Sequence, residues 1–148
     1  MSNSFKHRLT LIRDLTLTDW FLVIEAWWTL LWVSLSLRFS NLENVQKSIH
    51  IASSSAINST NSLAFAQRLQ KLVYLASRLH LPPAACLQRS LTLQRMLAKQ
   101  GINSQLCIGV NDKVDTVFAH AWVQINDQPI GESEDIQTTF KILEPLNR

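Results

Sequence analysis

Two residues of this sequence, Cys86 and His120, have side chains that could act together as a nucleophile and its base. Pro82 and Pro83 directly precede the amphipathic stretch AACLQRSLTLQRMLAKQ, and proline is favoured in the first turn of a helix. Cys86 therefore falls in the first turn of a predicted helix. There, unpaired N–H groups and the positive end of the helix dipole favour thiolate over thiol. Such a thiolate needs only a neighbouring base to become an effective nucleophile.

His120 lies in FAHAWVQI, whose alternating pattern predicts a β-strand. The face expected to meet the core carries Ala119, Ala121, Val123 and Ile125. The opposite face carries His120, Trp122 and Gln124, so we expect the imidazole to be displayed rather than buried in the core. If the helix that begins near Cys86 packs against this strand, His120 can supply the base.

An acidic group that orients the imidazole is expected in IGESEDI, just past the next predicted strand. Glu132 and Asp135 are both candidates, since a neighbouring strand can bring a carboxylate beside His120. Glu134 fits a solvated loop better. The second cysteine, Cys107, lies on a predicted strand away from any helix end, so we expect a passive thiol there.

The element pattern is helical first and extended afterwards, which predicts an α+β fold. The block Leu17–Ser40 holds four of the five tryptophans and has Thr18 or Asp19 as its expected N-cap. Apolar periodicity predicts further helices over Leu63–Leu79 and from Pro83 to a C′ glycine at Gly101. Strands are expected at 105–110, 118–125 and 128–130, with the last two joined by a tight turn at Asn126 and Asp127.

The net charge of +3 comes from scattered Lys and Arg residues, which does not favour nucleic-acid binding. The first ten residues lack the apolar core of a secretory signal, so a cytoplasmic location with reduced thiols is expected. The uncharged part of the tryptophan block is Ala26–Leu37, shorter than the roughly 20 residues of a spanning helix. We therefore expect no membrane span, with anchoring at a membrane surface by Leu17–Phe39 as an alternative.

Several motifs together resemble one family, the leader peptidases of lasso-peptide biosynthesis, which belong to the transglutaminase-like, papain-related cysteine peptidases. The resemblance covers roughly Leu63 to Leu146. It rests on Cys86-Leu87-x-Arg89-Ser90-Leu91, Leu97-x-x-x-Gly101-Ile102, Ile108-Gly109-Val110 and Ala119-His120-Ala121-Trp122-Val123, in that order.

The resemblance implies a cysteine endopeptidase that needs no cofactor or metal. It would remove the leader from a ribosomally made precursor peptide before a cyclase closes the lasso ring. By position, Cys86 would be the nucleophile, His120 the general base and then acid, and Glu132 the orienting carboxylate, with Asp135 as the alternative. The family usually has Asp at the place of Glu132 and often Glu at the place of Gln124, so this chain departs from the pattern at both positions.

The implied organisation is an apolar helical region at 1–50, a Ser/Asn-rich connection at 51–62 and a transglutaminase-like, papain-like core at 63–148, with the nucleophile's helix packed on an antiparallel sheet. Nothing before Ser62 resembles the winged-helix module that binds leaders in these systems. The resemblance is thus to the split form, which implies a separately encoded leader-recognition protein, the precursor peptide and a cyclase as partners. A non-catalytic scaffold that delivers the precursor, and a transglutaminase that passes the acyl group to an amine, are the alternatives.

Overall fold

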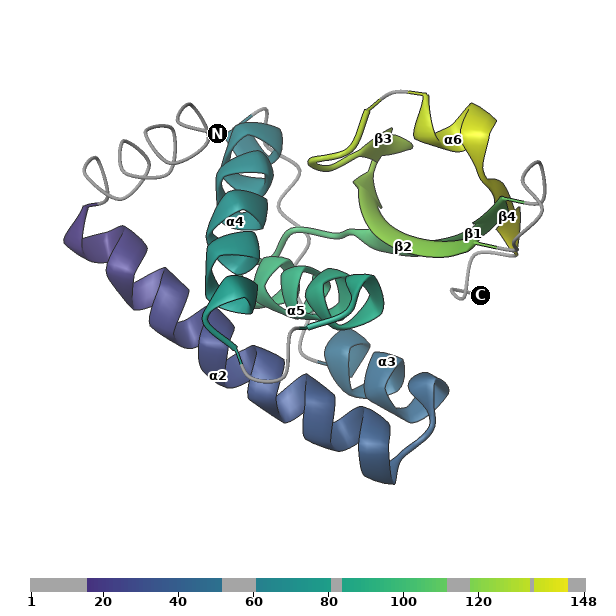
Figure 1. Ribbon diagram of the computed structural model, residues 1–148. Helices are drawn as coiled ribbons and strands as arrows, with labels where there is room; N and C mark the ends of the chain where they lie inside the picture. Colours follow the sequence, from purple (N-terminus) through teal and green to yellow (C-terminus); the bar gives the residue numbers. More distant parts are fainter. Residues whose placement is uncertain (1–15, 52–60, 81–83, 112–117, 134, 144–148) are drawn as a thin grey trace, which may run out of the picture.

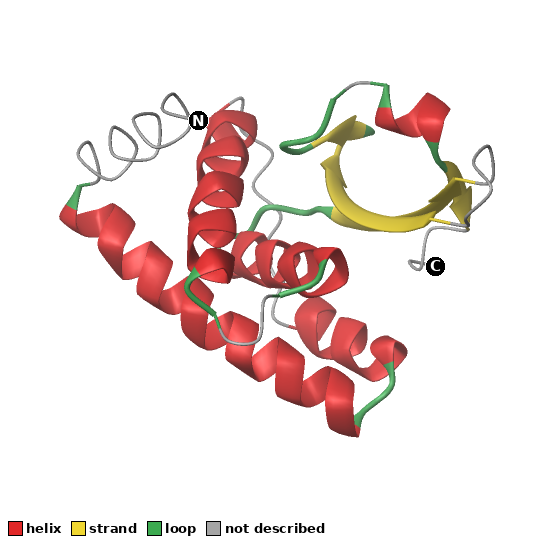
Figure 2. Cartoon of the chain, in the orientation of Figure 1, coloured by secondary structure: helices red, strands yellow, loops and turns green. Residues whose placement is uncertain are grey.

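A computed structural model describes residues 16–51, 61–80, 84–111, 118–133 and 135–143. Helices come first along the chain and a four-stranded antiparallel sheet follows, which confirms the predicted α+β fold (Figures 1 and 2). The elements are α2 (Leu17–Phe39), α3 (Leu42–Ile51), α4 (Asn61–Arg78), α5 (Cys86–Lys99), β1 (Gln105–Asn111), β2 (Phe118–Ile125), β3 (Gln128–Pro129), α6 (Ile136–Thr139) and β4 (Lys141–Leu143). The predicted connection at 51–62 falls mainly on residues 52–60, which lie outside the described residues.

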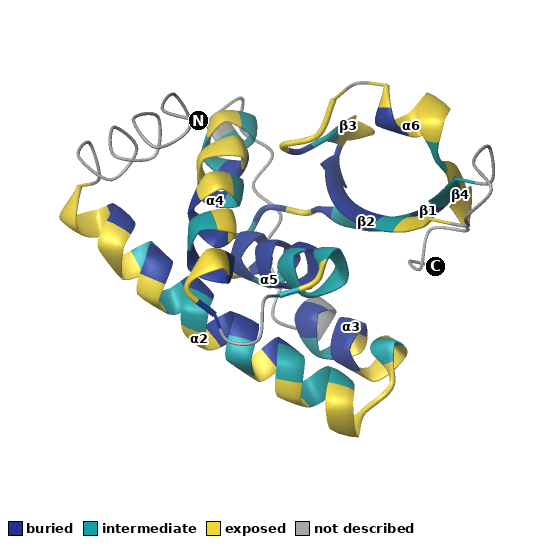
Figure 3. Ribbon diagram, in the orientation of Figure 1, coloured by how far each residue is buried: buried dark blue, intermediate teal, exposed yellow. Residues whose placement is uncertain are grey.

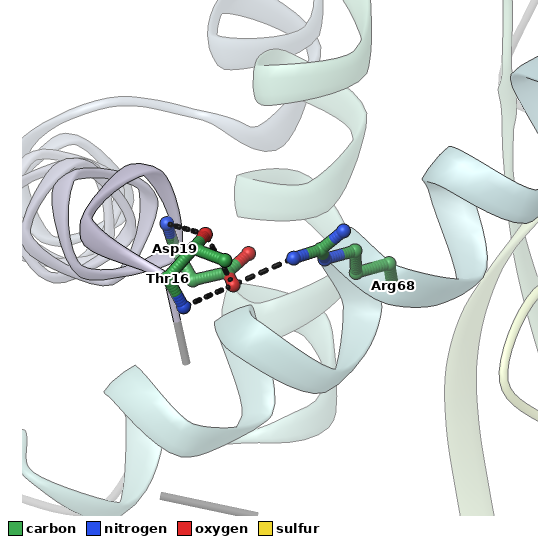
Figure 4. Close-up of polar contacts among 3 residues, drawn as sticks. All are labelled: Thr16, Asp19 and Arg68. Carbon is green, nitrogen blue, oxygen red and sulfur yellow. Dashed lines mark hydrogen bonds and ion pairs between the residues drawn. The ribbon is translucent and has the colours of Figure 1, made fainter. Parts of the chain in front are cut away.

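Helix α2 begins with a capping box whose N-cap lies two or three residues before the caps expected from sequence. Thr16 is the N-cap: its Oγ1 accepts a hydrogen bond from the Asp19 N–H at 3.3 Å, and the Asp19 carboxylate accepts one from the Thr16 N–H at 2.9 Å. The expectation of Thr18 or Asp19 as the cap was therefore wrong. Asp19 is the N3 residue of the box, and its buried carboxylate also bonds Arg68 of α4 at 2.6 Å (Figure 4).

Helix α5 lies between the other helices and the sheet (Figure 1). Its buried face joins α2, α4 and β2 in one apolar cluster, because residues spaced three and four apart on each helix share a face. Central members of this cluster are Ala26, Leu30, Leu69, Val73, Leu97 and Val123. The helix ends as expected: Gly101 adopts a φ of 71°, which a glycine at C′ tolerates, and its N–H bonds the carbonyl of Ala98.

One face of α2 packs on this cluster, and the other is exposed and apolar (Figure 3). The side chains of Phe21, Trp28 and Phe39 are 73%, 62% and 80% exposed. By length and composition α2 is the one helix in the described part of the chain that could cross a membrane, although core helices of soluble proteins meet the same criterion.

The sheet has the strand order β3-β2-β1-β4, and every neighbouring pair is antiparallel. Strand β1 pairs with β2 along its whole length, which places His120 opposite Gly109. Asn126 and Asp127 adopt φ values of 49° and 63°, as a two-residue hairpin turn requires. The three predicted strands and the turn are therefore confirmed, although β1 extends one residue further than predicted, to Asn111, and β3 ends one residue earlier, at Pro129. Helix α6 and strand β4 had not been expected.

The second face of β2 is covered, contrary to expectation. Trp122 is 1% exposed and packs with Cys107, Ile136 and Phe140, because the chain after β3 folds back across the sheet through α6. The face of β2 that was expected to be polar therefore contributes, through Trp122, to a second and smaller hydrophobic core. His120 lies at its border, with 19% of its side chain exposed.

Candidate active site

Helix α5 begins at Cys86, three residues after the start at Pro83 that the sequence predicts, so Cys86 lies in the first turn as expected. Its neighbour Ala85 is the N-cap, and the first hydrogen bond of the helix runs from the Arg89 N–H to the Ala85 carbonyl. The N–H groups of Cys86 and Leu87 precede that bond, so the helix supplies them with no acceptor of its own. The half-buried thiol therefore lies at the end of a helix where negative charge is stabilised.

His120 is held by the carboxylate of Glu132. The two groups meet at 3.0 Å between the imidazole Nε2 and Oε1 of Glu132, with the carboxylate side chain 33% exposed. Stacking on one side restrains the ring further: Trp122 lies 6.2 Å away between centroids at an interplanar angle of 17°. Because Nε2 is used by Glu132, Nδ1 is the nitrogen left to serve as a base.

One pocket of about 200 Å³ joins these three residues. Cys86 reaches it from the helical layer, whereas His120 and Glu132 reach it from the sheet. Its other lining residues are Gln70, Val73, Tyr74, Arg89, Ser90, Leu93, Ala121, Trp122, Ile130 and Gly131. The described contacts include no hydrogen bond from the Cys86 sulfur to the imidazole, and such bonds often form only when a substrate is bound.

Ser90 links helix α5 to strand β2 at the pocket. Its buried hydroxyl donates a hydrogen bond of 2.9 Å to the carbonyl of Ala121, the residue after His120. Ser90 follows Cys86 by four residues, or about one helical turn. The bond therefore fixes the position of the helix start relative to the strand that carries the imidazole.

Asp135, the alternative acid, is not at the imidazole. It is the N-cap residue of α6 and is exposed, and its backbone carbonyl accepts hydrogen bonds from Thr138 and Thr139. Among the described residues, Glu132 is the only carboxylate bonded to His120. Gln124 bonds to Gln105 instead of to the imidazole.

Cys107 differs from Cys86 in its position in the fold and in its burial. It lies on β1, is 1% exposed and packs under Trp122. Burial, with a smaller contribution from the charge of Asp127, raises the pKa of the Cys107 thiol to about 11. The thiol is therefore neutral at physiological pH, in line with the expectation of a passive cysteine.

Sequence reasoning did not single out Tyr74 and Arg89 as pocket residues. Arg89 follows Cys86 by three positions, so helical spacing alone could have placed it on the same face. Tyr74 comes from α4, and no local signal ties that helix to the pocket. In the described ranges, no cluster of three or more His, Cys, Asp or Glu residues is arranged to hold a metal ion.

Comparison with known families identifies the superfamily of this chain. The sequence model of the transglutaminase-like superfamily matches residues 29–144, most of the chain, and the chain therefore belongs to that superfamily, which includes cysteine peptidases. The match begins within α2, so part of the first described helix is included. Searches of curated proteins and of solved structures gave no match.

Proposed function

We propose that this protein is a cysteine peptidase that removes the leader from a ribosomally synthesised lasso precursor peptide before a cyclase closes the ring. The observation that carries the proposal is the shared pocket of Cys86, His120 and Glu132, with the imidazole oriented by the 3.0 Å bond to the carboxylate. A thiol at a helix start, a histidine with one free ring nitrogen and an orienting acid are the components of acyl transfer through cysteine.

In the first half of the proposed reaction, His120 Nδ1 takes the proton of the Cys86 thiol. The thiolate attacks the scissile carbonyl carbon and forms a C–S bond. The oxyanion is met by N–H groups at the start of α5, where the helix leaves donors unused. The imidazolium then gives its proton to the leaving amine as the C–N bond breaks, which leaves a thioester.

In the second half, His120 takes a proton from water, and the resulting hydroxide attacks the thioester carbonyl. The C–S bond breaks, the acid product leaves, and the thiolate recovers the proton from the imidazolium. Glu132 stabilises the imidazolium in both halves by accepting from Nε2–H. The side-chain oxygen of Gln88, in the first turn of α5, accepts a hydrogen bond from the Ala85 N–H at 2.7 Å.

The proposed partners are a separately encoded leader-recognition protein, the precursor peptide and the cyclase, all in the cytoplasm. The exposed apolar face of α2, which includes Phe21, Ile24 and Trp28, supports a contact with the recognition protein, since patches of this kind commonly mark interaction sites. Gel filtration of the chain with that protein tests the contact. Failure to co-elute would contradict the split organisation.

Mass spectrometry of a lasso precursor incubated with the chain and the recognition protein tests the activity. We expect leader release by the wild type and by Cys107→Ala, and a loss of about 10²–10⁴-fold or more in Cys86→Ala and His120→Ala. If no form releases the leader while the partner is bound and the protein folded, the chain is a delivery scaffold instead. Transfer to an added amine in place of water would identify a transglutaminase.

A further inference from the structure

Arg89 places a positive charge in the wall of the Cys86 pocket. The residue is partly buried and lines the pocket together with Cys86 and His120. Its guanidinium carbon lies 5.6 Å from the centre of the Tyr74 ring. This cation–π contact fixes the planar guanidinium against α4, so the donors on its other edges have a defined direction.

Among the described residues, Arg89 has no acidic partner in an ion pair. The ion pairs among the described residues are Glu43–Lys47, Asp19–Arg68, Glu25–Lys99 and His120–Glu132, and none includes Arg89. Of the described residues that line the pocket, Glu132 is the acidic one, and its carboxylate bonds the imidazole. A partly desolvated cation without a carboxylate costs free energy that a bound anion would offset.

We propose that Arg89 forms an anion subsite beside Cys86, which binds an acidic side chain of the peptide next to the scissile bond. The inference rests on the proposed peptidase function, to which it adds a specificity-determining residue. A guanidinium binds a carboxylate through two parallel N–H···O bonds, which gives both affinity and orientation. A Glu or Asp side chain held there would position the peptide backbone across the thiol.

Alkylation of Cys86 by iodoacetate and by iodoacetamide tests the subsite without knowledge of the natural peptide. The two reagents are similar in size and differ in charge. Using the full-length folded protein and mass mapping of each cysteine, we expect the rate ratio of iodoacetate to iodoacetamide to fall about fivefold in Arg89→Gln. A lower thiolate content in the variant would slow both reagents equally and leave the ratio unchanged.

Arg78→Gln is the matched control. Arg78 also lies over the Tyr74 ring, at 6.0 Å, but it does not line the pocket. Its removal should leave the ratio as in the wild type, whereas Arg89→Lys should retain part of the preference for the anion. Equal ratios in wild type and Arg89→Gln would overturn the proposal.

A second measurement does not depend on a reactive thiol. In Cys86→Ala protein, NMR titration compares acetyl-Gly-Glu-Gly-amide with acetyl-Gly-Gln-Gly-amide, and we expect tighter binding of the Glu peptide that disappears when Arg89→Gln is added. Equal binding of the two peptides would refute the subsite. If Cys86 resists both alkylating reagents, the peptidase proposal fails, and this titration still decides the role of Arg89.

Discussion

His120 and Glu132 are twelve residues apart in sequence, and their side chains meet at 3.0 Å across the end of the β2–β3 hairpin. The contact depends on the tight turn at Asn126 and Asp127, which sends the chain back beside β2. The next residues, Gly131 and Glu132, then line the same pocket as the imidazole. The Glu132 carboxylate is therefore placed beside the imidazole by the backbone of the hairpin.

Replacing Glu132 should reduce turnover far more than replacing Asp135. We expect Glu132→Ala to lower kcat for leader release by about 10²–10⁴-fold with little change in KM, because the imidazole loses its orientation and its counter-charge. Glu132→Asp should recover part of the rate. Steady-state kinetics of these variants and of Asp135→Ala check this, and a comparable loss in Asp135→Ala would contradict the assignment.

The two cysteines should differ sharply in their reaction with iodoacetamide. At about pH 8 we expect Cys86 to be modified and Cys107 to remain intact, because burial raises the pKa of the Cys107 thiol to about 11 and leaves little thiolate. Both should react once the chain is unfolded in guanidinium. Mass spectrometry of the modified peptides distinguishes them, and rapid labelling of folded Cys107 would show that the expectation is wrong.

Gly109 should tolerate no side chain. A Cβ at this position would lie 2.7 Å from the Cβ of Phe140 and 2.9 Å from the ring of Trp122. We expect Gly109→Ala to lower the free energy of unfolding by about 1–3 kcal/mol through overpacking, and to reduce activity because Trp122 stacks on His120.

Urea unfolding measures the effect of Gly109→Ala, with Lys141→Ala on the neighbouring strand as the control. Lys141 is exposed, so its truncation should change stability by less than about 0.5 kcal/mol. Equal stability of Gly109→Ala and wild type would mean that the second core is loosely packed.

Asp19 should make the stability of the protein depend on pH in the acidic range. Its hydrogen bond from Arg68 outweighs the opposing effect of burial and lowers the pKa of the carboxyl from 3.8 to about 2. Because the folded protein holds the charged form, the stabilisation is complete above the unfolded-state pKa of 3.8 and is lost as the pH falls toward 2.

Asp19→Asn removes both the ion pair and this pH dependence. We expect it to destabilise the protein at neutral pH by about 1–2 kcal/mol, with the difference from wild type narrowing in acid. Thermal unfolding at several pH values tests this, with Glu43→Gln as the control because its pair with Lys47 is exposed. A difference that stays constant down to pH 2 would indicate that the charge of Asp19 is not stabilising.

Local signals predicted the parts of the fold that are set by nearby residues. The glycine at 101 and the Asn126-Asp127 pair each restrict the backbone directly, and the helix end and the hairpin turn were found where expected. The prolines predicted the start of α5 to within one turn, since the helix begins at Cys86 rather than at Pro83. The cap of α2 was misplaced by two or three residues because Thr16, Thr18 and Asp19 lie close together and each side chain can accept a capping hydrogen bond. The side chains of Thr16 and Asp19 each accept a hydrogen bond from the other residue's backbone N–H, an arrangement that is seen only in the structure.

Long-range contacts explain what sequence reasoning missed. Helix α6 and strand β4 are four and three residues long, too short to show a period, and they exist because Ile136 and Phe140 pack on Trp122. The choice between Glu132 and Asp135 likewise depended on the path of the chain after β3. The role of Tyr74 depended on where α4 packs.

The hydrogen bond from Ser90 to the Ala121 carbonyl joins the layer that carries the thiol to the layer that carries the imidazole. Cys86 and His120 lie on opposite sides of this contact. They would move apart if the helices shifted relative to the sheet, even while both kept their secondary structure. Loss of catalysis on mild heating or in low urea would then precede loss of the helical circular dichroism signal. Activity would in this way report whether the helices and the sheet are still packed together.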